Sequence, residues 1–96
     1  MKMIHLKLFS ILAELAGFRD FEFETRKVIS FFDFLSILFE KTPKKFKDYI
    51  YNEEKELLKG SITIVVNEKV FDEKEIYALE LKNGDIIAIL TPIEGG

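Results

Sequence analysis

The group in this sequence that is best suited to react lies at its end, where residues 90–96 read LTPIEGG. Gly95 and Gly96 have no side-chain functional group, so the reactive group they can present is the terminal carboxylate of Gly96. Without a Cβ atom the chain is slim and adopts dihedral angles closed to other residues, which suits passage through a narrow active site. We therefore predict that the Gly96 carboxylate is the reacting group and that residues 91–96 form a flexible tail.

The residues before the two glycines are expected to guide this tail. Pro92 fixes its own φ angle, which lowers the entropic cost of ordering the tail when it docks. Leu90 and Ile93 supply apolar side chains on either side of the proline. We predict that Ile93 contacts a partner, and we favour packing within the domain over a partner contact for Leu90. Glu94 places a charge that any channel admitting the tail must accommodate.

Composition and charge exclude several classes of function. Fourteen basic and seventeen acidic residues give a net charge of −3, which offers no electrostatic footprint for a nucleic-acid backbone. The absence of cysteine excludes disulfides, thiolate metal sites and thiol nucleophiles. His5 is the one histidine; we expect it to be solvated, and it has no second histidine to share a metal. We therefore expect no metal, no cofactor bound by this chain and no independent enzymatic activity.

The chain has no stretch close to the ~18 consecutive apolar residues that a membrane-spanning helix needs. Its first residues also lack the length and cleavage site of a signal peptide. We therefore expect a cytoplasmic protein with no membrane partner.

Residues 1–90 are predicted to form one α+β domain that positions the tail. Alternating apolar residues predict strands, and they cover residues 3–9, 20–25, 61–66, 70–71 and 86–90. The last strand is apolar on both faces, as expected in the middle of a sheet. Because the first and last strands are the most apolar, we expect them to be central neighbours in a mixed sheet that one long helix crosses. That architecture is the ubiquitin-like β-grasp fold.

Helices and turns are predicted between these strands. Ser10 is expected to cap a short helix that ends at Gly17 in the left-handed conformation, and Ser30 is expected to cap the long helix before Pro43. Tight turns are expected at residues 67–68 and 83–85. The segment 44–58 is predicted to be irregular with about one helical turn, and its apolar anchors are Phe46, Tyr49, Ile50, Leu57 and Leu58.

The long helix has an apolar face that spans roughly 220°, about twice the stripe of a surface helix that faces a core. Its centre is predicted to consist of Phe31, Phe34, Leu35 and Leu38. Phe32, Ile37 and Phe39 widen the two flanks. If the core uses only the centre, these three residues form an association margin for a partner or a second copy. The alternative is that residues 44–58 cover them.

Four segments of the sequence resemble the small subunit of molybdopterin synthase, the MoaD-type sulfur carriers. The segments are KLFSILAELAG, SFFDFLSILFEKTP, TIVVNEKVFD and LKNGDIIAILTPIEGG, and together they cover nearly the whole chain. The final diglycine is the most specific part, because two terminal glycines arise by chance in roughly one chain in 200. The sequence departs from the family at Glu68, where glycine is usual, and at Glu94, where a small residue is commoner.

The resemblance implies a sulfur carrier. An E1-like, MoeB-type enzyme would adenylate the Gly96 carboxylate, with ATP and magnesium belonging to that enzyme. Sulfur would then displace AMP to give a thiocarboxylate that donates sulfur for the molybdopterin dithiolene on a large, MoaE-type subunit. Two alternatives stay open. The activated carboxylate could serve protein modification or transfer-RNA thiolation, or the chain could be a non-covalent ubiquitin-like binding module.

Overall fold

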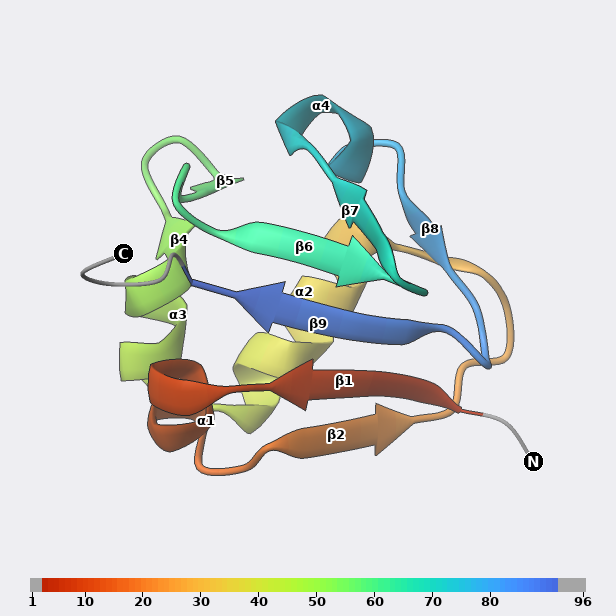
Figure 1. Cartoon of the computed structure of the whole chain (residues 1–96), viewed down its shortest axis with the longest axis horizontal. Helices are drawn as coiled ribbons and strands as arrows, with labels where there is room; N and C mark the ends of the chain where they lie inside the picture. The colour runs from red at the N-terminus through yellow and green to blue at the C-terminus, as the bar shows by residue number, and fades with distance from the viewer. Residues whose placement is uncertain (1–2, 92–96) are drawn as a thin grey trace.

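A five-stranded mixed sheet is the largest element of the computed structural model, which describes residues 3–91 except for the Glu73 side chain. The strand order is β2-β1-β9-β6-β7. The parallel pair β1 and β9 lies at the centre (Figure 1), and the remaining neighbours are antiparallel. The strands are β1 (Ile4–Leu8), β2 (Asp20–Phe23), β6 (Thr63–Val66), β7 (Lys69–Phe71) and β9 (Ile86–Leu90). The prediction that the first and last strands are central neighbours is therefore confirmed.

The long helix α2 (Phe31–Lys41) crosses one face of this sheet, behind it in Figure 1. Three shorter helices accompany it, namely α1 (Ser10–Ala16), α3 (Lys44–Ile50) and α4 (Glu73–Ile76). Two small antiparallel ladders pair β3 (Ile29–Ser30) with β8 (Glu80–Leu81) and β4 (Tyr51–Asn52) with β5 (Leu57–Leu58). The result is the predicted two-layer α+β arrangement of a β-grasp fold.

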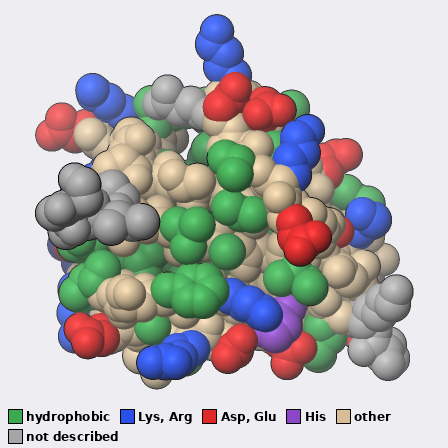
Figure 2. Space-filling model, in the orientation of Figure 1, with side chains coloured by type: hydrophobic (Ala, Val, Ile, Leu, Met, Phe, Trp, Pro, Cys, Tyr) green, Lys and Arg blue, Asp and Glu red, His purple; other side chains and the backbone are tan. Residues whose placement is uncertain are grey.

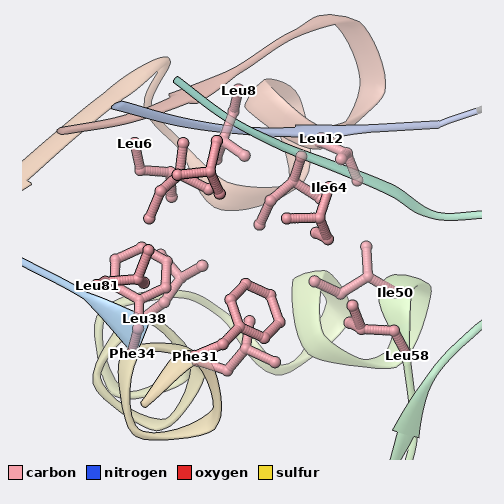
Figure 3. Close-up of a cluster of buried hydrophobic side chains, with 14 of the residues drawn as sticks. Leu6, Leu8, Leu12, Phe31, Phe34, Leu38, Ile50, Leu58, Ile64 and Leu81 are labelled. Carbon is pink, nitrogen blue, oxygen red and sulfur yellow. The ribbon is translucent and has the colours of Figure 1, made fainter. Parts of the chain in front are cut away.

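The core lies between the sheet and the helices, as Figure 3 shows. From α2 the four predicted residues are buried, namely Phe31, Phe34, Leu35 and Leu38. Each strand contributes every second residue, because neighbouring side chains of a strand point to opposite faces; the central pair supplies Ile4, Leu6, Leu8, Ile87 and Ile89. Burying one such side chain contributes about 1.5–3 kcal/mol to folding. The core therefore fixes the central strands and holds the end of β9 in place.

Of the two helix caps predicted at serines, the structure confirms one and contradicts the other. Ser30 is the N-cap of α2, and its Oγ accepts a hydrogen bond from the Asp33 N–H at 3.0 Å, as predicted. The cap at Ser10 is wrong, because Ser10 is itself the first residue of α1 with a φ of 48° and the N-cap is Phe9. Gly17 ends α1 with a left-handed φ of 90°, which confirms the predicted C-cap.

The segment 44–58 is more regular than predicted. It forms α3 and the β4–β5 ladder, because Phe46 and Ile50 are one helical turn apart and both are buried in the core. Lys47 and Glu53 form an ion pair between the helix and the following turn, with 3.0 Å between Nζ and Oε1. Tyr49, a predicted anchor, faces solvent instead.

The predicted association margin is half-buried and packs largely within the chain. The Phe39 ring contacts the rings of Phe46 and Tyr51, with centroids 6.3 and 5.5 Å away. The Phe32 ring stacks on Tyr77 with its centroid 5.2 Å away. Residues 44–58 thus cover Phe39, in line with the alternative, whereas Phe32 packs on Tyr77, the C-cap residue of α4. Association through Phe32, Ile37 and Phe39 stays a prediction.

Candidate functional site

The candidate site begins at the end of the central strand β9, where the tail follows. Leu90, the last residue of β9, is half-buried and pairs with Thr63 of β6, while Ile89 pairs with Leu8 of β1. The root of the tail is thus held on both sides by neighbouring strands. The other predicted tail residues lie outside the described part of the chain, namely Pro92, Ile93, Glu94, Gly95 and Gly96.

The sheet face opposite the helices carries an apolar surface beside this root. On this face Ala88 of β9 lies opposite Val65 of β6, and Val65 lies opposite Val70 of β7. Val70 and Ile86 are 61% and 46% exposed. We call this surface the sheet-face patch, and it consists of Val65, Val70, Ile86, Ala88 and Leu90. Figure 2 shows apolar side chains gathered across this face.

The patch corrects one interpretation of the sequence. The last strand is central, as predicted, but only the face with Ile87 and Ile89 is covered by helices. The face with Ile86, Ala88 and Leu90 stays partly open to solvent. The sequence signal for the patch is the apolar run on both faces of this strand. That run predicts burial of both faces, but it fits equally well a strand with one face exposed. Exposed apolar surfaces of this kind mark sites of association.

Charged residues border the patch on the β1–β2 side. His5 Nε2 lies 2.8 Å from Asp20 Oδ1, and His5 Nδ1 lies 3.8 Å from Glu22 Oε2. His5 therefore bridges the two strands at the exposed surface of the sheet, where a solvated histidine was expected. Its neighbours are carboxylates of the strand surface, so His5 links β1 to the edge strand β2.

A buried carboxylate fixes the start of β9, at the end far from the tail. The Asp85 side chain accepts hydrogen bonds from Asn67 Nδ2 at 2.9 Å, from the Lys82 N–H at 2.9 Å and from Lys82 Nζ at 3.2 Å. Burial raises the pKa of Asp85, but these hydrogen bonds and the Lys82 charge outweigh it, so the pKa lies below the usual value. The Ile86 N–H donates to Asn67 Oδ1 at 2.9 Å, which ties β9 to the β6–β7 turn.

That turn explains how the chain tolerates Glu68 in place of the usual glycine. Asn67 and Glu68 both have left-handed φ angles, of 50° and 71°. Two central residues with positive φ are the signature of a type I′ turn, whose twist matches a two-stranded hairpin. The predicted turn is confirmed, and Glu68 occupies a conformation that costs an L-residue about 1–2 kcal/mol.

Within residues 3–91, no three histidine, cysteine, aspartate or glutamate side chains gather in a way that could hold a metal ion. Across the same residues, no helix combines the length and apolarity that crossing a bilayer requires. What the described residues do supply is a rigid strand that ends at the tail, with an apolar surface next to it.

The crossed helix, the parallel central pair and the strand that leads into the tail define a ubiquitin-like β-grasp protein. The model of the ThiS family matches residues 6–96. The chain therefore belongs to the ThiS family, whose members are ubiquitin-like sulfur carriers related to the MoaD type. No protein of curated function matches the sequence.

Solved structures with this fold include modifiers and carriers. Small archaeal modifier protein 1 from Methanosarcina acetivorans is 30% identical, with a TM-score of 0.75 over 100% of this chain and 98% of its own. Urm1 from Trypanosoma brucei is 16% identical, with a TM-score of 0.78 over 99% and 96%. A Pyrococcus furiosus protein provisionally described as molybdopterin converting factor subunit 1 is 24% identical, with a TM-score of 0.66 over 97% and 100%.

Proposed function

We propose that this chain is a sulfur carrier of the molybdopterin synthase small-subunit type, with Gly96 as the end that carries sulfur. The observation that carries the proposal is the family match, which runs through Gly96 and so includes the two glycines. A diglycine a few residues beyond the last strand of a β-grasp domain suits a terminus that enters another protein's active site.

The proposed chemistry has two steps at the Gly96 carboxyl. In the first, a carboxylate oxygen attacks the α-phosphorus of ATP in an E1-like, MoeB-type enzyme, which forms the acyl adenylate and releases pyrophosphate. In the second, a sulfur nucleophile attacks the carbonyl carbon, a C–S bond forms and the C–O bond to AMP breaks. The thiocarboxylate sulfur then forms a C–S bond to a pterin on a MoaE-type large subunit, and water cleaves the bond between that sulfur and the Gly96 carbonyl carbon, which returns the carboxylate. ATP and magnesium belong to the activating enzyme.

The described residues support this role by positioning and recognition. β9 is held between β1 and β6, and its first residues are tied down by Asp85 and Asn67. The sheet-face patch includes Leu90, so a partner that binds the patch also takes hold of the root of the tail. We assign the patch, together with Pro92 and Ile93, to contacts with the activating enzyme and the acceptor.

One observation favours a second candidate function. The M. acetivorans protein, a small archaeal modifier, is 30% identical over the full chain. In a modifier, the activated Gly96 carbonyl would be attacked by a lysine amine, so that an amide forms and AMP leaves. Both candidates need the same activation, and they differ only in the nucleophile that follows. Transfer-RNA thiolation would use the thiocarboxylate with a different acceptor.

Intact mass spectrometry tests the proposal. The protein is incubated with an E1-like enzyme, ATP and a sulfide source, and a variant lacking Gly96 serves as control. We expect a mass increase that corresponds to replacement of one oxygen by sulfur, and no increase in the variant. Failure to gain sulfur with several activating enzymes would contradict the proposal and favour a non-covalent module.

A parallel reaction separates carrier from modifier. The same mixture without sulfide, but with a cell extract, is digested and searched for lysines that carry the tail peptide. The carrier hypothesis predicts no such lysines. Lysine conjugates that disappear when Gly96 is deleted would instead establish the modifier.

A further inference from the structure

A second surface feature, which meets the sheet-face patch at Val70, is a groove of about 370 Å³ at the β7 edge of the domain. It lies between the start of β6, the end of β7, α4 and the first turn of α2. We call it the edge groove. Its apolar lining includes Phe32, Ile62, Phe71 and Tyr77, and its polar lining includes Lys59 and Asp72.

We propose that the edge groove binds the chain's own tail, with Ile93 on its apolar lining and Glu94 beside Lys59. The tail starts next to the groove, because Leu90 pairs with Thr63, which also lines it. From β9 to β7 the distance is two strand spacings, about 10 Å. Ile93 and Glu94 lie three and four residues beyond Leu90 and reach up to about 10 and 14 Å from it when the chain is extended, so both reach the groove without unfolding of the sheet.

The charges of the groove match this occupant. Asp72 already caps α4, because its Oδ1 accepts the Glu75 N–H at 2.8 Å. Among the described carboxylates, which do not include that of Glu73, none lies within ion-pair distance of Lys59. The groove therefore presents the Lys59 cation next to an apolar surface, and the tail presents an anion next to isoleucine.

The size of the groove also fits a short peptide segment. Its volume is near the lower end of the ~300–1,000 Å³ range of ligand pockets, which suits one apolar side chain with its neighbours. Gly95 and Gly96 have no side chains to dock, so they extend beyond the groove. Docking of Ile93 therefore shields its apolar side chain while the terminal carboxylate stays accessible. A partner that binds Ile93 must first displace it from the groove.

The inference concerns the free protein and can be tested without an activating enzyme. The full chain, labelled with ¹⁵N, is compared by NMR with a variant that lacks residues 92–96. We expect the deletion to shift the amide signals of residues 59–63 and 70–77, which surround the groove, and to leave those of β2 unchanged. Because no ATP or sulfide is present, the result is independent of the sulfur-transfer test.

Charge variants make the assignment specific. Lys59→Glu and Ile93→Ser should each move the groove signals to the positions seen in the deletion variant. The matched control Lys55→Glu, an exposed lysine outside the groove, should leave the signals in place. Combining Lys59→Glu with Glu94→Lys should restore the signals of the unaltered chain.

Three results would overturn the proposal. Deletion shifts confined to Leu90, Thr91 and their strand neighbours would show that the tail does not reach the groove. Shifts that grow with protein concentration would indicate the tail of a second copy. A double variant that fails to restore the groove signals would rule out the Lys59–Glu94 pair.

Discussion

At the scale of single residues, the least expected feature is a glutamate in a left-handed turn position. Glu68 has a φ of 71°, a conformation that glycine adopts without steric cost. We predict that Glu68→Gly raises the free energy of unfolding by about 1 kcal/mol, because it removes the left-handed penalty. Urea denaturation measures this difference.

The neighbouring residue provides the control for that prediction. Lys69 lies in the extended strand β7, where glycine loses conformational entropy on folding and gains nothing. Lys69→Gly should therefore destabilise the protein. If Glu68→Gly were also destabilising, the type I′ turn would not carry the strain that we assign to it.

Asp85 gives the fold a pH dependence whose sign follows from its hydrogen bonds. The pKa of Asp85 is lowered in the folded protein from its ordinary value of 3.8, so the folded state favours the carboxylate. The stabilisation is therefore present above pH ~3.8 and is lost as the pH falls through the folded pKa. We predict that Asp85→Asn lowers stability at pH 7 by about 1–3 kcal/mol, since Asn67 and Lys82 lose a charged acceptor.

The pH profile distinguishes this effect from a general loss of packing. The difference in unfolding free energy between the unaltered protein and Asp85→Asn should shrink as the pH falls below 3.8. The matched variant Asp48→Asn changes an exposed aspartate of α3 and should have little effect at pH 7. A difference for Asp85→Asn that is constant from pH 7 to pH 3 would contradict the assigned ionisation.

At the scale of elements, α2 depends on its N-cap because the core holds only one of its faces. Ser30→Ala removes the acceptor for the Asp33 N–H and should cost about 1 kcal/mol of stability. Ser36→Ala, on the exposed face of the same helix, is the matched control and should change stability little. Thermal denaturation followed by circular dichroism measures both. Equal effects of the two substitutions would argue against a stabilising cap.

Elements with strong periodicity could be predicted from the sequence, whereas weakly patterned ones could not. The alternation in β1 and the stripe of α2 each report burial on one face, so their positions and buried residues were predicted correctly. α3 and the β4–β5 ladder could be predicted only in part, as about one helical turn, because their charged residues hide a pattern in which Phe46, Ile50 and Leu58 reach the core. The sheet-face patch could not be predicted, because the sequence of a central strand does not show whether its apolar residues contact helices or solvent.

At the scale of the whole molecule, one face of the sheet stabilises the fold and the other is available for recognition. Substitutions on the open face should therefore change partner binding without changing stability. We predict that Val70→Glu lowers the rate of activation by an E1-like enzyme at least tenfold, about 1.4 kcal/mol, because a charge buried within an apolar interface is poorly solvated. Val70 is 61% exposed in the free protein, so the unfolding free energy should change by no more than about 0.5 kcal/mol.

Tyr49→Glu is the matched control, since Tyr49 is 44% exposed on α3 and does not belong to the sheet-face patch. Pyrophosphate release measures activation, and urea denaturation measures stability. Slow activation with Val70→Glu alone would mean that the enzyme holds the sheet face and the tail together. If both variants were activated at the normal rate, the tail residues would carry recognition by themselves, and the apolar patch would have to serve the acceptor or a second copy.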